Sequence, residues 1–221
     1  SSDLDLDFLL KDWQKLMNSM QVGADRIQQI VLSLRNFSRV DGSEIKSVDI
    51  HQGIENTLLI LQHRLKAVGD RPEIKIIKEY GQLPPVTCYV GQLNQVFMNL
   101  LSNAIDARES APTPREITIR TEVKTEEEKQ IISPTPHSSL PTPSVIIHIA
   151  DNGSGMNQEV RHQIFDPFFT TKPVGSGTGL GLSISYQIVV EKHGGKLSCI
   201  SEVGKGTEFV VEIPLIAKPV N

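Results

Sequence analysis

Residues 177–183 read Gly-Thr-Gly-Leu-Gly-Leu-Ser, with three glycines at alternate positions that lead directly into a helical pattern. Glycine adopts positive φ without steric cost and lets the backbone approach a ligand closely. The start of the helix offers unpaired N–H groups and the positive end of its dipole, which suit a phosphate chain. Taken alone, the stretch is a weak indication and also fits a flexible loop before an ordinary helix, so its meaning depends on the motifs around it.

A second glycine motif comes earlier in the chain. The apolar run 146–150 is typical of a buried strand, and it ends at Asp151, which Gly153 and Gly155 follow. A carboxylate at such a strand end can accept a hydrogen bond from the amino group of a flat heterocycle, and the glycines let that heterocycle come close. Considered alone, the segment is better explained as an ordinary turn in which aspartate accepts a local hydrogen bond.

The sequence predicts a helix over residues 91–108 with two asparagines on one face. Asn99 and Asn103 are four residues apart, so their carboxamides emerge on the same side of the helix. Asn103 can offer a hard oxygen ligand to Mg²⁺, a cation that keeps most of its waters and needs few protein ligands. The alternative is a plain solvated face beside an apolar stripe.

Three phenylalanines lie between the Asp151 motif and the glycine-rich stretch 177–183. They belong to residues 164–172, which read Ile-Phe-Asp-Pro-Phe-Phe-Thr-Thr-Lys. Aromatic side chains in a loop usually fill a core. Here they can instead hinge a segment over a nucleotide, with Lys172 reaching phosphate oxygens as a point charge.

In the chain, the asparagine helix comes first, followed by the Asp151 motif, the phenylalanine segment and the glycine-rich stretch 177–183. In that order the motifs resemble the nucleotide-binding fold shared by histidine kinases, type II topoisomerases, the heat-shock chaperone ATPase and mismatch-repair ATPases. The likeness spans residues 46–214 and ends with Gly204 and Gly206 before Thr207. It implies that Asp151 binds the adenine amino group, that Asn103 holds Mg²⁺, and that residues 165–179 form a lid over ATP. The residues implied in ATP binding are Asn99, Asn103, Asp151, Gly153, Gly155, Lys172, Gly177, Gly179, Leu180, Gly181 and Thr207.

The pattern of apolar residues predicts an α+β fold, a two-layer sandwich with helices on one face of a sheet. Strands are expected over 47–50, 74–80, 86–89, 116–123, 145–150, 196–201 and 207–213, and helices over 53–67, 91–108, 158–164 and 180–192. The charged, proline-rich stretch 124–144 predicts a mobile hairpin excursion, with a docking or regulatory loop as the alternative.

The first 45 residues predict a separate unit. Residues 4–37 have a helical pattern, and an apolar heptad seam runs along it (Met20, Ala24, Ile27, Val31, Leu34). A helix of that length favours a partner helix over burial within one compact domain. The unit resembles the second helix of a histidine kinase's dimerisation hairpin, in the style of cyanobacterial sensor kinases, which implies a homodimer.

Asn99 distinguishes the branches of the resembled group. Hydrolysing members carry a glutamate there as general base, whereas a carboxamide has no useful basicity. Kinase members have asparagine at both places, and phosphoryl transfer depends mostly on positioning and charge neutralisation. Two features depart from the kinase pattern. Many sensor kinases have a phosphate-touching lysine where this chain has Asp106, so either Lys172, with or without Lys205, compensates, or phosphate is held more loosely.

The acceptor histidine is the second departure. In this family it is followed by an acidic residue and then proline, and none of the six histidines of the chain is. We therefore expect the acceptor to precede residue 1. The sequence thus indicates the catalytic region of a two-component sensor histidine kinase, with a response regulator as its downstream partner. The alternatives are a non-catalytic nucleotide-binding regulatory module and a hydrolase of the chaperone or topoisomerase type.

Charge and apolar runs indicate which partners this chain contacts. A net charge of −4 and a pI near 5.9 argue against a nucleic-acid-binding surface. No run approaches the roughly 18 apolar residues of a membrane span, so we expect a cytoplasmic chain without membrane contact, whether or not a longer parent protein is anchored. Cys88 and Cys199 match no metal-ligand spacing and are expected to be free thiols.

Overall fold

The computed structural model describes residues 45–67, 72–107, 114–124, 143–173 and 177–216, together with the helical residues Trp13, Met17 and Met20. In chain order the elements are β1 (Ile45–Val48), α2 (Ile50–Leu65), β2 (Ile74–Tyr80), β3 (Val86–Tyr89), α3 (Val90–Asp106), β4 (Arg115–Lys124), β5 (Ser144–Asp151), α4 (Gln158–Gln163), α5 (Gly181–Tyr186), a π-helical turn η2 (Gln187–Lys192), β6 (Lys196–Glu202) and β7 (Gly206–Pro214).

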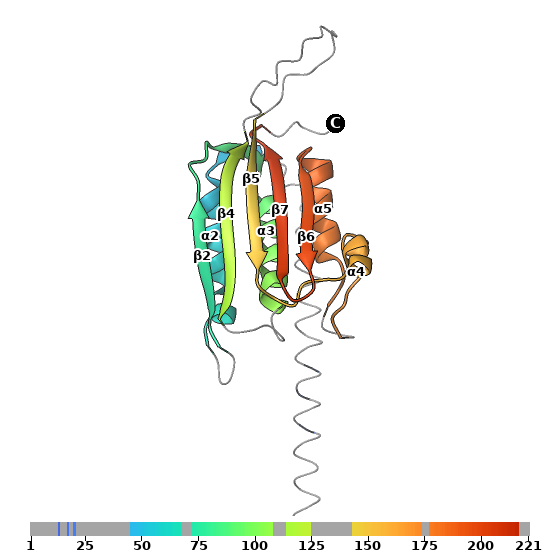
Figure 1. Cartoon of the computed structure of the whole chain (residues 1–221). Coiled ribbons are helices and arrows are strands. Elements are labelled where there is room, and N and C mark those ends of the chain that lie inside the picture. The colour runs from blue at the N-terminus through green and yellow to red at the C-terminus, as the bar shows by residue number, and fades with distance from the viewer. Residues whose placement is uncertain are drawn as a thin grey trace, which may run out of the picture.

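Five strands form one sheet in the order β2-β4-β5-β7-β6, and β1 pairs with β3 in a separate two-stranded ribbon. Within the large sheet β2 and β4 are parallel, and the other neighbours are antiparallel. Figure 1 shows α2, α3 and α5 side by side behind the sheet, with α4 near the β6 edge. The predicted two-layer α+β sandwich is therefore confirmed.

The core lies between the sheet and the helices. Residues of the central strands alternate between the two faces because side chains in a strand repeat every two residues. Those on the helix side are fully buried: Ile117, Ile119, Val145, Ile147, Ile149, Val211 and Ile213 are each at most 1% exposed. From α3, Leu93, Val96, Phe97, Leu100, Leu101 and Ala104 pack into the same cluster. Since this side of α3 is buried in the core, only its other side can contribute residues to a site.

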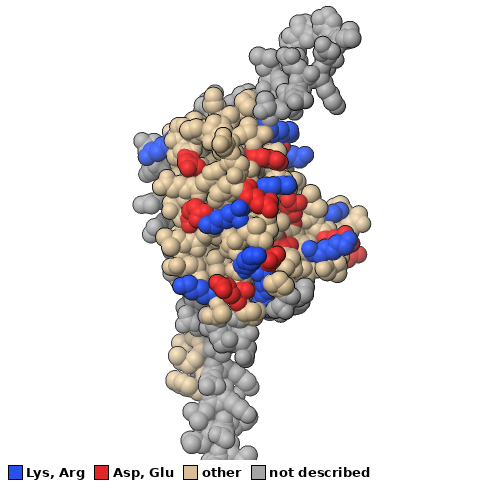
Figure 2. Space-filling view, turned by 60° about the vertical axis from the view of Figure 1, so that its left-hand side comes forward, with Lys and Arg blue, Asp and Glu red and all other residues tan. Residues whose placement is uncertain are grey.

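The other face of the sheet is polar. Cross-strand polar contacts cover it, such as the ion pair of Lys124 of β4 with Glu212 of β7 at 3.0 Å and the hydrogen bond between His148 of β5 and Glu208 of β7 at 2.8 Å. On the side of the molecule that Figure 2 shows, positive and negative side chains are interspersed rather than gathered by sign. An antiparallel sheet with one face on the core and one in water has this pattern.

Element boundaries agree with the sequence-based expectation within a few residues. The helix expected over 180–192 is the exception, since its second half is a π-helical turn. There the backbone N–H of His193 donates to the Ile188 carbonyl at 3.2 Å, and the His193 Nδ1–H donates to the same oxygen at 2.7 Å. The wider turn brings both donors onto one acceptor, and no local sequence pattern predicts it.

Two predictions lie largely outside the described residues. The helix over residues 4–37 is described only at Trp13, Met17 and Met20, which are exposed. The hairpin excursion over 124–144 is described only at its first residue and its last two. Both stay predictions. None of the helices in the described part of the chain combines the length and the hydropathy needed to cross a membrane.

Candidate functional site

Asp151 is the last residue of β5 and is held in place by its neighbours in the sheet. It lies between Ile117 of β4 and Thr207 of β7 in the strand register. Only 8% of the residue is exposed. Its Oδ1 accepts a hydrogen bond from the Gly153 backbone N–H at 2.7 Å. The carboxylate is therefore fixed at the edge of the core.

The two glycines after Asp151 leave no room for side chains. A Cβ on Gly153 would lie 2.6 Å from both the Asp151 Oδ1 and the Ala107 carbonyl oxygen. Gly155 has a φ of +66°, and a Cβ there would lie 1.9 Å from the Glu202 carbonyl oxygen. Glycine is thus required for the loop to fit between the end of α3 and the β6–β7 turn.

Thr207 lies beside Asp151 and belongs to a small hydroxyl network. Its Oγ1 is 2.9 Å from the Ser201 Oγ, which also donates to the Gly206 carbonyl at 3.0 Å and accepts from the Met156 N–H at 2.9 Å. Sequence reasoning missed Ser201. Its place two residues after Cys199 and four after Leu197, on the inward face of β6, was the available signal.

Asn99 and Asn103 lie on the same face of α3, as predicted. The Asn99 Nδ2 donates to the Gly181 carbonyl at 2.9 Å and to the Ser185 Oγ at 3.2 Å. The amide of Asn99 thus ties α3 to the first turns of α5. Asn103, one turn further on, is partly buried.

The glycine-rich stretch lies against the phenylalanine segment. Gly179 has a φ of +67°, and a Cβ there would lie 2.3 Å from the Phe168 carbonyl carbon. The Phe168 N–H donates to the Gly179 carbonyl at 2.9 Å. Phe168 itself has a positive φ of 68° and is 73% exposed. A bulky residue in that conformation is uncommon, and the sequence did not reveal it.

Lys172 contacts a carboxylate of the protein. Its Nζ lies 2.5 Å from the Asp106 Oδ2, and Arg64 of α2 contacts the other oxygen of the same carboxylate. The sequence predicted Lys172 as a phosphate contact and noted Asp106 as a departure. It did not predict that the two residues meet.

Contacts between distant parts of the chain bring several of the predicted site residues together around the second half of α3. The Ser154 N–H donates to the Ala107 carbonyl at the end of α3 at 3.2 Å, Asn99 contacts Gly181, and Asp106 contacts Lys172. Leu180 immediately precedes α5, and Gly177 lies against Lys172.

The chemistry of this site fits a magnesium ion that arrives with phosphates. Among the described residues, no group of three or more His, Cys, Asp or Glu side chains is placed to hold a metal. Mg²⁺ usually keeps several waters and takes one or two protein ligands plus substrate phosphates. Asn103, on the same face of α3 as Asn99, carries an amide oxygen of the kind that Mg²⁺ accepts as a ligand.

Both cysteines are free, as expected. Burial raises the pKa of the Cys88 thiol to about 11 and is the main reason that the pKa of Cys199 rises to about 12. Neither thiol is therefore a reactive thiolate near neutral pH.

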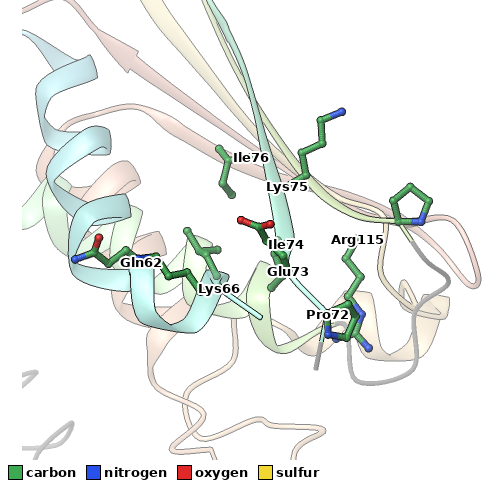
Figure 3. Close-up of a pocket in the computed structure, with 10 residues that line it drawn as sticks. Gln62, Lys66, Pro72, Glu73, Ile74, Lys75, Ile76 and Arg115 are labelled. Carbon is green, nitrogen blue, oxygen red and sulfur yellow. The ribbon is translucent and has the colours of Figure 1, made fainter. Parts of the chain in front are cut away.

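A separate pocket of about 660 Å³ lies between the end of α2 and the edge strand β2. Figure 3 shows Gln62 and Lys66 on one side of it and Pro72, Ile74 and Arg115 on the other. The pocket is lined by none of the site residues predicted from the sequence.

Comparison with known proteins identifies the family. Residues 89–217 match the family described as histidine kinase-, DNA gyrase B-, and HSP90-like ATPase. The sensor kinase CckA of Brucella abortus is 36% identical over 201 residues, which are 90% of this chain and 20% of that protein. The two-component sensor PprA of Pseudomonas aeruginosa is 33% identical over 222 residues, which are 98% of this chain and 21% of that protein.

A solved structure of a histidine kinase domain has a similar fold. The catalytic domain of histidine kinase ThkA has a TM-score of 0.60 and 26% identity, covering 79% of this chain and 97% of that one. The fold is an α+β sandwich similar to that of this catalytic domain. The chain belongs to the family of histidine kinase-, DNA gyrase B- and HSP90-like ATPases, and its curated relatives are sensor histidine kinases. It spans about a fifth of the length of these relatives.

Proposed function

We propose that this chain is the catalytic, ATP-binding region of a two-component sensor histidine kinase. In this proposal it binds MgATP and passes the γ-phosphoryl group to a histidine of a dimerisation hairpin, for relay to an aspartate of a response regulator. The observation that carries the proposal is the buried Asp151 carboxylate, fixed by the Gly153 N–H at 2.7 Å at the edge of a glycine-lined loop.

Each part of the site has a role in this proposal. Asp151 accepts a hydrogen bond from the adenine amino group, and Thr207 lies near the base. Because Gly153 and Gly155 have no side chains, the backbone of this loop can lie close to the purine. Asn103 holds Mg²⁺, which neutralises phosphate charge. Lys172 and the backbone of residues 177–181 lie beside the phosphates.

The geometry of Asn99 favours a kinase over a hydrolase. A hydrolase needs a general base here, but the Asn99 side chain is a donor to the Gly181 carbonyl at 2.9 Å. A carboxylate in its place would face that carbonyl oxygen and be repelled. The arrangement supports a site that holds ATP until a histidine side chain attacks it.

Titration calorimetry of the chain with MgATP tests the binding step. We expect binding in the wild type and a loss of at least about tenfold in Asp151→Asn, since the amide presents a donor or a weaker acceptor to the adenine amino group. MgITP, which has an oxygen in place of that amino group, should bind the wild type poorly. Equal affinity of wild type and variant for MgATP would contradict the assignment.

A phosphotransfer assay tests the reaction. The chain is incubated with MgATP and a separately supplied dimerisation hairpin that carries an acceptor histidine, and we expect acid-labile phosphohistidine on the hairpin. Tight binding without transfer to any hairpin would favour the regulatory-module alternative. Multiple-turnover release of inorganic phosphate would favour a hydrolase. Homodimerisation through residues 1–45, the first of the two domains we propose, is tested by sedimentation of this chain.

A further inference from the structure

One carboxylate at the end of α3 binds two cations from different parts of the fold. Arg64, in the last turn of α2, contacts the Asp106 Oδ1. Lys172, in the loop that precedes α5, contacts the Oδ2 at 2.5 Å. The three side chains are about equally accessible, at 28%, 33% and 34% for Arg64, Asp106 and Lys172. The cluster therefore carries one more positive charge than negative.

This cluster lies on the phosphate side of the proposed nucleotide site. Asp106 follows Asn103 by three residues on α3, so the two side chains share a helix face. The stem of Lys172 lies against the glycine motif, because a Cβ on Gly177 would be 3.2 Å from both its Cβ and its Cδ. The ammonium of Lys172 thus contacts a residue one turn after the expected magnesium ligand, while the stem of Lys172 contacts the expected phosphate loop.

Resting on the proposed nucleotide binding, we propose that Lys172 changes partner when a nucleotide binds, leaving Asp106 for a phosphate oxygen. Asp106 then acts as an internal anion that competes with the phosphates for the same ammonium. It is a positioning residue that acts through Lys172, and it lowers affinity for phosphorylated ligands while leaving the base end of the site unaffected.

Arg64 makes this exchange possible. Removing one partner from a buried ion pair is costly because it leaves an uncompensated charge. Here Arg64 stays on Asp106 when Lys172 leaves, so the carboxylate keeps a partner. Partly exposed ion pairs are weak, and a polyphosphate carries more negative charge than one carboxylate. The ammonium can therefore transfer to phosphate at little cost.

A double-mutant cycle measured by titration calorimetry tests the exchange. The proteins are wild type, Asp106→Asn, Lys172→Gln and the double variant, each titrated with MgATP and with adenosine, which has no phosphate. We expect Asp106→Asn to bind MgATP about threefold more tightly, as removal of a weak competing pair requires. Lys172→Gln should bind MgATP more weakly. In the Lys172→Gln background, Asp106→Asn should have no further effect, and adenosine should bind all four proteins alike.

Controls separate this mechanism from others. If Asp106→Asn tightens MgATP binding equally in both backgrounds, the carboxylate merely repels phosphate and the exchange is wrong. Unchanged or weaker binding in Asp106→Asn also overturns it. A wild type that does not bind MgATP would instead overturn the proposed function itself.

Thermal unfolding checks each fold, and Asp106→Ser provides a second uncharged variant with the same expected affinity. Glu212→Gln, which breaks the ion pair with Lys124 on the open face of the sheet, removes one negative charge as Asp106→Asn does and should leave MgATP affinity at the wild-type value. A tightening in Glu212→Gln equal to that in Asp106→Asn would make the effect one of net charge and overturn the exchange.

Discussion

The two ends of the proposed site are built in opposite ways. At the base end, Asp151 is 8% exposed, and the loop around it is fixed by glycines with no room for a Cβ. At the phosphate end, the Asp106 side chain is 33% exposed and is held by ion pairs with Arg64 and Lys172. Close packing transmits strain, whereas partly exposed ion pairs exchange partners easily. Changes at the base end should therefore affect stability and binding together, and changes at the phosphate end should affect affinity alone.

The largest effect is expected from Gly206→Ala at the base end. Gly206 has a φ of +101°, and a Cβ there would lie 1.9 Å from the Asp151 carbonyl oxygen. The backbone must move, so we expect a loss of roughly 3 kcal/mol of unfolding free energy or more, together with nucleotide binding. Urea unfolding measures the first and calorimetry the second.

Gly204→Ala is the matched control for this change. Gly204 also has a positive φ, of +80°, but nothing lies within 4 Å of an added Cβ. The cost should be limited to the backbone conformation, about 1 kcal/mol. Equal losses in the two variants would show that the packing around Asp151 is not what makes this end rigid.

Asn99→Asp should have the next largest effect, because Asn99 ties α3 to the first turns of α5. The carboxylate cannot donate to the Gly181 carbonyl, which lies 2.9 Å from the Asn99 Nδ2. We expect a loss of roughly 2 kcal/mol of unfolding free energy, more than for Asn99→Ala, in which no charge faces the carbonyl. An aspartate variant as stable as wild type would mean that this tether does not matter.

Low pH should weaken the hydrogen bonds by which His193 holds the start of α3. His193 is only 1% exposed. Its Nδ1–H donates to the Ile188 carbonyl, and its Nε2 accepts from the Tyr89 N–H at 3.2 Å. Burial lowers the pKa of His193 in the folded state. Between that pKa and the unfolded value of about 6.5 the unfolded chain binds more protons, so stability falls as pH falls below about 6.5. Unfolding free energies of wild type and His193→Asn are measured from pH 8 to pH 5. The advantage of the wild type should shrink as pH falls through that window, whereas parallel profiles would contradict this role of His193.

The smallest effect is expected from Lys205→Gln. Lys205 pairs with Glu202 at 2.8 Å, and its side chain is 72% exposed. An exposed ion pair contributes little to stability, and Lys205 is on the β6–β7 turn at the base end. We expect MgATP affinity within about twofold of wild type. A loss as large as that of Lys172→Gln would place Lys205 on the phosphates.

The sequence predicted most of what depends on local pattern. The strand 74–80 and the strand 86–89 have the predicted bounds, because apolar alternation and glycine positions are read locally. The pairing of Asp106 with Lys172 joins residues 66 apart in sequence, and no local pattern encodes it. The Ser201 network and the π-helical turn before His193 likewise depend on which strands and helices become neighbours. The domain boundary near residue 45 and the roles of the site residues stay predictions.

A crystal structure of the chain with MgADP tests the central claim most directly. We expect the adenine amino group within hydrogen-bonding distance of the Asp151 carboxylate and the phosphates near Asn103 and Lys172. A nucleotide bound elsewhere, for example in the pocket between α2 and β2, with Asp151 far from the base, would contradict the account.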